Sequence, residues 1–214
     1  GGGGLTRYNP ATNTWTNFNG HGGGKIAAQA KPSGGYYLWS SIGGTNGMTR
    51  WNSSTGAWTS FPFAAGQPAA LVSLDSVDDA GNVWMMRWVG IQGQQTLDCM
   101  RPDGTWITPP LPPLHPQVPV AALRAFGTLQ AIFVDGFGHL QRFDGRSWTD
   151  LGPIPSSGFI DDLEVAADGT IWLCGSSEGG AFRRDGATGQ WQRYRITNTS
   201  QFDSFNNDLT IDPA

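Results

Sequence analysis

Large apolar and polar residues alternate in short runs along the whole chain, and Gly-, Asn- and Asp-rich segments separate the runs. Alternation with a period of two is the pattern of a half-buried β-strand. Trp58-Thr-Ser-Phe61, for example, follows the Asn-, Ser- and Gly-containing segment 52–56. Such segments predict hairpin turns, because Gly and Asn accept the positive φ that tight hairpins need.

The alternating runs form a repeat. Five tryptophans follow such turns at spacings of 43, 48, 42 and 43 residues. Upstream of four of them lies a second aromatic residue within a strand pattern, and an apolar run precedes each of these. One unit therefore reads strand, turn, aromatic strand, Gly-rich segment, strand, turn, Trp strand. The repeated tryptophans are Trp15, Trp58, Trp106, Trp148 and Trp191, and the upstream aromatics are Trp39, Trp84, Phe133 and Trp172.

Four antiparallel strands in about 43 residues are typical of a β-propeller blade. We therefore predict an all-β protein, with residues 1–214 forming one propeller domain in which about five repeats are visible. The expected first strands of the blades cover residues 26–30, 70–74, 120–126, 163–167 and 209–211.

The repeat frame is cut within a blade. Residue 1 falls before a third strand and residue 214 falls just after a first strand, so one second strand is missing. We interpret the chain as an excerpt of a longer propeller, and the alternative is a five-bladed ring with a defective strand at its seam. The third repeat carries an insertion at residues 87–95, and the fourth has a short turn at residues 135–138.

Two near-identical segments, Asp79-Ala-Gly-Asn-Val-Trp84 and Asp168-Gly-Thr-Ile-Trp172, carry a family resemblance. With the Gly-rich stretch 175–180, the Arg-aromatic third strands and the turns into Trp, they resemble two-component-regulator propeller repeats. More loosely, the chain is similar to virginiamycin B lyase-type propellers. The first resemblance implies an extracytoplasmic sensing propeller within a longer protein. The second implies a His and an acid placed together over the central channel, but no residue here matches that motif.

Composition narrows the function classes. The 31 Gly and 14 Pro exclude a helical architecture, and the net charge of −4 with only two Lys argues against nucleic acid as a partner. No stretch reaches the roughly 20 apolar residues of a membrane span. Cys99 and Cys174 make neither a disulfide framework nor a metal site, so we expect two buried free thiols.

Catalytic signals are sparse. His21, His115 and His139 occupy different positions in their repeats and have no metal-ligand spacing, so we assign no catalytic or metal residue. The turn carboxylates are interpreted as caps of backbone N–H groups. These are Asp79, Asp103, Asp144, Asp168 and Asp185.

The candidate ligand-binding residues fall into two groups. One group precedes the first strands, where a propeller brings its connections together at the mouth of a channel, and polar groups there favour a small polar ligand or a cation. The other is the third-repeat insertion, where an aromatic residue stands outside the two repeated series. The first group is Lys25, Asp161, Asp162, Asn207 and Asp208, and the second is Arg87 and Trp88.

The sequence therefore favours a non-catalytic recognition propeller, extracellular or periplasmic, within a larger sensor or cell-surface protein. Its expected partner is a protein, peptide or glycan. No cofactor is predicted, although a cation at the channel mouth is left open. Two alternatives remain: a propeller enzyme of the lyase or glycan-active type, and a structural surface repeat that serves assembly.

Overall fold

A computed structural model describes residues 5–18, 26–41, 47–63, 70–89, 94–107, 109–110, 120–135, 137–156, 160–175, 180–195 and 209. Within these ranges the chain forms strands and turns and contains no helix, so no described helix can span a membrane. The chain divides into two compact units, Gly1–Pro109 and Pro110–Ala214. The prediction that both belong to one domain stays a prediction.

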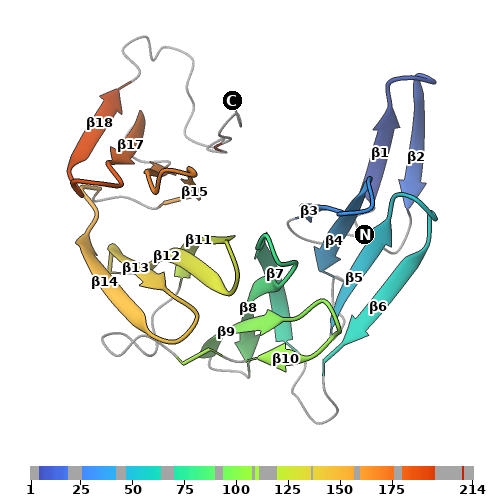
Figure 1. Cartoon of the computed structure of the whole chain (residues 1–214), viewed down its shortest axis with the longest axis horizontal. Helices are drawn as coiled ribbons and strands as arrows, with labels where there is room; N and C mark the ends of the chain where they lie inside the picture. Colours follow the sequence, from blue (N-terminus) through green and yellow to red (C-terminus); the bar gives the residue numbers. More distant parts are fainter. Residues whose placement is uncertain are drawn as a thin grey trace. The chain divides into compact units, whose positions relative to one another are not determined.

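The first unit contains one hairpin and two four-stranded antiparallel sheets (Figure 1). The hairpin has the sequence pattern of the third and fourth strands of a blade, and we number it as the first blade. The second and third blades are complete. The hairpin is β1 (Leu5–Asn9) and β2 (Thr14–Phe18); the second blade is β3 (Ile26–Ala30), β4 (Tyr36–Ser41), β5 (Gly47–Asn52) and β6 (Trp58–Pro62); the third is β7 (Ala70–Val77), β8 (Val83–Val89), β9 (Gln94–Met100) and β10 (Trp106–Ile107).

The second unit contains two further antiparallel sheets with the same strand order. The fourth blade is β11 (Val120–Phe126), β12 (Gln130–Asp135), β13 (His139–Phe143) and β14 (Trp148–Pro153), and the fifth is β15 (Asp162–Val165), β16 (Ile171–Gly175), β17 (Gly180–Arg184) and β18 (Trp191–Arg195).

The blades confirm the predicted repeat. Each of the five repeated tryptophans lies in the fourth strand of its blade, and the upstream aromatics lie in the second strands. Trp58 faces Trp51 across the last hairpin of the second blade, and Trp148 faces Phe143 in the fourth. Of the fifth expected first strand, only Leu209 lies within the described residues.

The predicted insertion of the third repeat, residues 87–95, lengthens a hairpin. Arg87 and Trp88 lie inside β8, because β8 and β9 are seven residues each and extend the hairpin beyond its counterparts of five or six residues. The additional residues therefore continue the antiparallel ladder, in which Arg87 pairs with Thr96 and Trp88 with Gln95. The side chain of Trp88 lies outside the described part of the structure.

Most turn residues have the expected backbone conformation. Asn13, Gly56, Gly104 and Gly145 have positive φ in the turns between third and fourth strands. In the fifth blade, Gly189 takes this conformation instead of the Gly of the Asp-Gly pair. Gly186 serves another purpose: a Cβ there would lie 2.6 Å from the carbonyl oxygen of Asp168, so two turns of one blade pack backbone to backbone.

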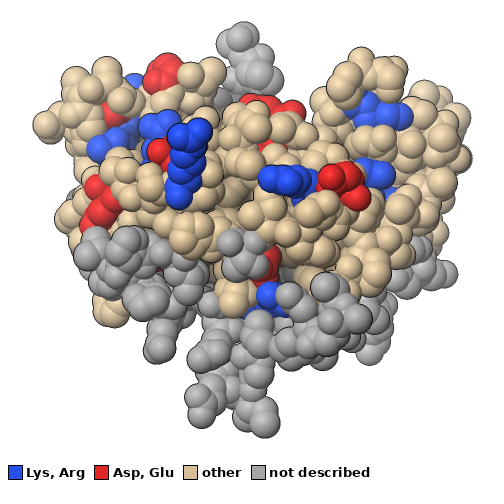
Figure 2. Space-filling view, turned by 60° about the horizontal axis from the view of Figure 1, so that its bottom comes forward, with Lys and Arg blue, Asp and Glu red and all other residues tan. Residues whose placement is uncertain are grey.

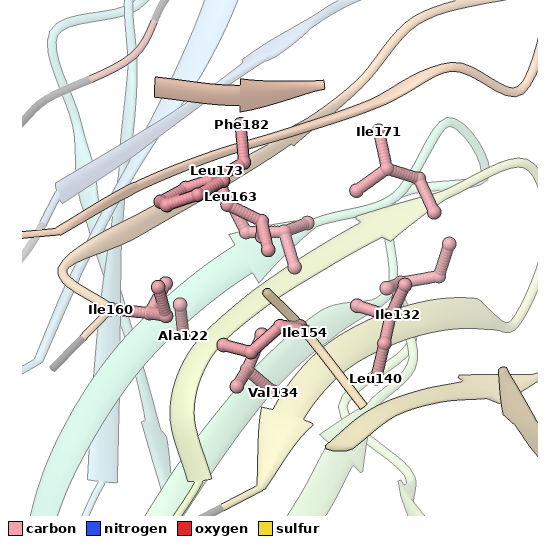
Figure 3. Packing of buried hydrophobic residues seen from close by; sticks show 10 residues of the cluster. All are labelled: Ala122, Ile132, Val134, Leu140, Ile154, Ile160, Leu163, Ile171, Leu173 and Phe182. Atoms are coloured by element: carbon pink, nitrogen blue, oxygen red, sulfur yellow. The ribbon is translucent and has the colours of Figure 1, made fainter. Parts of the chain in front are cut away.

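Apolar side chains pack between consecutive blades within each unit. In the second unit, Ile132, Val134 and Leu140 of the fourth blade cluster with Leu163, Leu173 and Phe182 of the fifth (Figure 3). In the first unit, Trp39 and Met48 of the second blade cluster with residues of the third. This packing between sheets explains the recurring aliphatic residues and buried aromatics such as Trp39, whereas Trp15 of the hairpin is 68% exposed. The third-blade members are Val83, Met85 and Met100.

Candidate functional site

Each of the four complete blades has two ends of different character. At the turn edge lie the two tight turns, between strands one and two and between strands three and four. At the opposite end, which we call the start edge, strand one begins and strand two ends. Arg87 and Trp88 lie near the start edge of the third blade, and Asp161 and Asp162 lie at that of the fifth. Lys25, Asn207 and Asp208 lie outside the described residues.

Arg87 is almost completely buried. Its Nε donates to Asp98 Oδ2 at 2.6 Å, and the two side chains are 7% and 3% exposed. Thr96 Oγ1 donates to the same carboxylate oxygen at 3.0 Å, and the guanidinium lies 5.2 Å from the ring centre of Phe63. Arg87 therefore joins the third blade to the residue that leaves the second blade. Its predicted ligand contact stays a prediction.

Asp161 and Asp162 have different environments. The Asp161 side chain is exposed, and its backbone N–H donates to the carbonyl of Cys174 at 2.9 Å. Asp162 is half-buried, and its Oδ2 accepts the backbone N–H of Leu209 at 2.8 Å. Asp162 thus holds a residue that lies 47 positions further along the chain, and Asp161 remains the more accessible of the two.

A second charged pair links the first strands of two blades. Arg124 Nε of β11 lies 3.1 Å from Glu164 Oε2 of β15, with exposures of 41% and 15%. First strands contact each other in both units, β3 with β7 and β11 with β15. Neither Glu164 nor Asp98 was singled out by sequence reasoning, because each is an isolated acid in the middle of a strand with no motif around it.

Four of the five predicted turn carboxylates cap backbone N–H groups. Asp103 Oδ1 accepts the N–H of Thr105 at 2.8 Å, and Asp168 Oδ1 accepts that of Thr170 at 2.9 Å. Such backbone N–H bonds favour the ionised form and hold the pKa of these carboxyls below their usual value. The four groups affected are Asp103, Asp144, Asp168 and Asp185.

Two further buried carboxylates, beyond Asp98, were not predicted from the sequence. In the turn of the third blade, Asp78 accepts the N–H of Asn82 at 2.8 Å and the indole N–H of Trp84 at 3.4 Å. Asp79, which the sequence predicts as the cap of this turn, is exposed. In the fourth blade, Asp135 accepts the N–H groups of Phe137 and His139. Both are structural: they hold turns that connect buried strands.

The described residues also contain one imidazole–carboxylate pair. His139 Nδ1 lies 3.0 Å from Asp150 Oδ2, on neighbouring strands of the fourth blade, and both are partly exposed. No group of three or more His, Cys, Asp or Glu side chains within the described ranges is arranged to hold a metal ion.

The two thiols are buried and form no disulfide, as expected. Burial is the main cause that raises the pKa of Cys99 to about 12, and the nearby charge of Asp78 adds to it. Cys99 is therefore a neutral core side chain.

The chain contains few charged residues, 14% of the total. Figure 2 shows one face of the molecule, on which blue and red residues lie in small groups with uncharged residues between them.

Comparison with known proteins identifies the fold as a β-propeller. No protein-family model and no curated protein sequence matches the chain. Solved structures do match. Virginiamycin B lyase from Staphylococcus aureus has 13% identity and a TM-score of 0.58, over 82% of this chain and 57% of the lyase. The chain thus spans less than three fifths of that enzyme.

Two further solved structures, neither of them a lyase, are similar to the chain. A chain in the nidogen/laminin complex has 11% identity and a TM-score of 0.65, over 90% of this chain and 72% of that chain. The extracellular domain of a protein from B. thetaiotaomicron assigned as a one-component system has 14% identity and a TM-score of 0.53, over 92% and 33%. At these identities the similarity establishes the fold, which both enzymes and binding proteins use.

Proposed function

We propose that the chain is a non-catalytic recognition propeller that binds a protein, peptide or glycan outside the cytoplasm, as part of a larger sensor or cell-surface protein. The proposal rests on the structural roles of the charged side chains in the described blades. The turn carboxylates cap backbone N–H groups, and the buried Arg87–Asp98 pair joins strands. Charged groups here mainly build the scaffold, which leaves the blade edges as the surface for recognition.

The start edge supplies the side chains for this binding in the proposal. Asp161 is exposed at the beginning of the fifth blade, and Trp88 lies one residue from the end of β8. A protein partner and an extracellular location are supported by the laminin complex and the extracellular domain among the similar structures. The two-component-regulator family remains the resemblance on which the sensor role rests.

A screen of random linear peptides displayed on phage, with the folded chain immobilised, tests the proposal. Enrichment of peptides that bind the folded chain saturably, and do not bind the chemically unfolded chain, is the expected result. Trp88→Ala and Asp161→Ala should each weaken such binding, and Asp103→Asn at a turn edge serves as the matched control. If neither peptides nor an array of glycans yields a saturable ligand, the proposal is wrong.

An enzyme of the lyase type is the second candidate, and the His139–Asp150 pair favours it. A carboxylate on Nδ1 orients an imidazole for general acid–base work. Incubation with virginiamycin B, followed by mass spectrometry, tests this candidate. If the chain cleaves virginiamycin B and the His139→Ala variant does not, the protein is an enzyme and the recognition proposal is wrong.

A further inference from the structure

The charged residues are distributed unevenly along the chain. The first 74 residues contain four Lys or Arg and no Asp or Glu. Residues 75–214 contain nine Lys or Arg and seventeen Asp or Glu. The first and second blades are therefore built without a single carboxylate side chain. Residues 1–74 carry a net charge of +4, and residues 75–214 carry a net charge of −8. The first part therefore attracts anionic ligands, and the second part attracts cationic ligands.

The fold does not require this absence of carboxylates. In the turns between strands three and four, Asp103 Oδ1 accepts the N–H of Thr105 at 2.8 Å, and Asp144 Oδ1 accepts that of Arg146 at 2.8 Å. In the second blade the amide oxygen of Asn52 accepts the N–H of Ser54 at 3.0 Å. The turn needs an oxygen acceptor, which Asp and Asn both provide. The neutral residue thus preserves the turn and leaves the surface without negative charge.

Two cations share one aromatic ring in this carboxylate-free region. Lys31 Nζ lies 5.3 Å and the Arg50 guanidinium carbon 4.4 Å from the ring centre of Tyr37. Lys31 donates to the neutral oxygens of Asn52 and Ser54, at 3.0 and 2.8 Å. Neither cation pairs with a carboxylate among the described residues. An incoming carboxylate would offset the repulsion between the two positive charges.

Arg7 of the hairpin adds a third cation, on the other face of the second blade from Arg50. It contacts Trp51, which follows Arg50 in β5, and neighbouring side chains of a strand point to opposite faces. The Arg7 guanidinium carbon lies 5.0 Å from the ring centre of Trp51, and its Nε is buried without a hydrogen-bond partner in the described structure. The hairpin is held against the second blade by Phe18, whose ring lies 5.6 Å from that of Trp51. We call Arg7, Lys31 and Arg50 the cationic edge; all three are half-buried and reach solvent.

We infer that the cationic edge binds an acidic, extended peptide segment of a partner protein. The inference rests on the proposed recognition function. It adds a contact surface at the turn edge of the second blade, where Lys31 lies between β3 and β4, to the start edge proposed above, and it names the chemistry of the partner. Carboxylates on alternate residues of an extended peptide point to the same side and can each meet a cation. Arg, Tyr and Trp are residue types enriched in protein interfaces.

Other polyanions fit this edge less well. The cations already lie over the rings of Tyr37 and Trp51, so these faces are not open for stacking against sugars or bases. A nucleic acid needs many phosphate contacts, and the excess negative charge of residues 75–214 opposes a long polyanion.

Fluorescence anisotropy with two labelled peptides tests the inference, one rich in Glu and the other with Gln at the same positions. The Glu peptide should bind the whole chain, and added salt should weaken the binding. A Lys31→Gln/Arg50→Gln double variant should weaken it roughly tenfold or more, since bonds to charged groups are worth about 1.5–3 kcal/mol and 1.4 kcal/mol is tenfold. Arg142→Gln/Arg146→Gln removes the same charge from the fourth blade and should leave the affinity nearly unchanged.

Asn52→Asp provides a second variant that preserves the fold, because Asp is the natural cap in later turns. It places a carboxylate beside Lys31 and should also weaken binding of the Glu peptide. Equal affinities for the Glu and Gln peptides, or equal losses in the two double variants, would overturn the inference. Tighter binding of a soluble polyuronate would assign the edge to glycans instead. If the chain without peptide forms dimers, and the Lys31→Gln/Arg50→Gln variant does not, the cationic edge binds a second copy of the chain instead.

These outcomes are separate from failure of the proposed function. A phage screen that enriches non-acidic peptides would leave the recognition function standing and remove only the cationic edge as its site.

Discussion

The Arg87 guanidinium donates from Nε to Asp98 Oδ2 at 2.6 Å, and both side chains are almost fully buried in the third blade. Asp98→Asn keeps the shape of the side chain but removes the charge that compensates the buried guanidinium. Because breaking a buried pair leaves an uncompensated charge, we expect the free energy of unfolding to fall by about 3–5 kcal/mol. Denaturation in urea measures this loss.

Arg124→Gln is the control for that prediction. It removes the more exposed pair with Glu164, and exposed pairs contribute about 1 kcal/mol or less. If Asp98→Asn and Arg124→Gln lower the free energy of unfolding equally, burial of the ion pair does not determine the cost of breaking it.

Gly186 should be more sensitive to substitution than Gly56. A Cβ at Gly186 would lie 2.6 Å from the backbone of Asp168 and Gly169, so Gly186→Ala must move one of two turns and should cost about 3 kcal/mol. Gly56 has a φ of +69° and open space around it, so Gly56→Ala should cost about 1–2 kcal/mol from backbone strain alone. Thermal unfolding of both variants measures the difference, and a reversed order would show that the turns of the fifth blade adjust freely.

The capping carboxylates should make the protein sensitive to acid. Their pKa values are lower in the folded chain than in the unfolded chain, because backbone N–H groups favour the ionised form. Their stabilising contribution is therefore complete above the unfolded pKa of about 3.9 and is lost as the pH falls through the folded values. Urea denaturation between neutral and acidic pH should show this decline.

A fourfold Asp→Asn variant is the matched test of that decline, because Asn also caps such turns in the first two blades. It should retain most of its stability at neutral pH and lose less than the natural chain on acidification. An unchanged acid profile would assign the sensitivity to other carboxyls. The substituted residues are Asp103, Asp144, Asp168 and Asp185.

Cys99 should be unreactive in the folded protein. Burial raises its pKa to about 12, so the thiol stays neutral at pH values where an unfolded cysteine, with a pKa of about 8.5, ionises. In a Cys174→Ala background we expect slow labelling by a thiol reagent at mildly alkaline pH and rapid labelling after unfolding in guanidinium chloride. Because the folded pKa is raised, the stabilising contribution of the neutral thiol is lost as the pH rises toward that value. Rapid labelling of the native protein would contradict the burial of Cys99.

The candidate site was predictable only in part. Asp161 is exposed at the start of the fifth blade, where the repeat places it, and Asp103 caps its turn as expected. Arg87 was selected from an apparent insertion, but the additional residues lengthen two paired strands and bury it. Its partner Asp98 has no local signature, because the pairing depends on which residues the register of β8 and β9 brings together.

The sequence by itself determined the β-propeller fold class, the order of the strands and the positions of most turns. Alternation and turn residues act over a few positions, so they can be read without knowledge of distant contacts. Only the tertiary structure decided that Asp78 rather than Asp79 is buried beneath its turn, and that Lys31 and Arg50 meet over Tyr37. Lys31 lies in a turn and Tyr37 and Arg50 lie on two different strands, so only the folded blade brings them together. Which of two adjacent aspartates is buried likewise depends on the packing around the turn and not on the local sequence pattern.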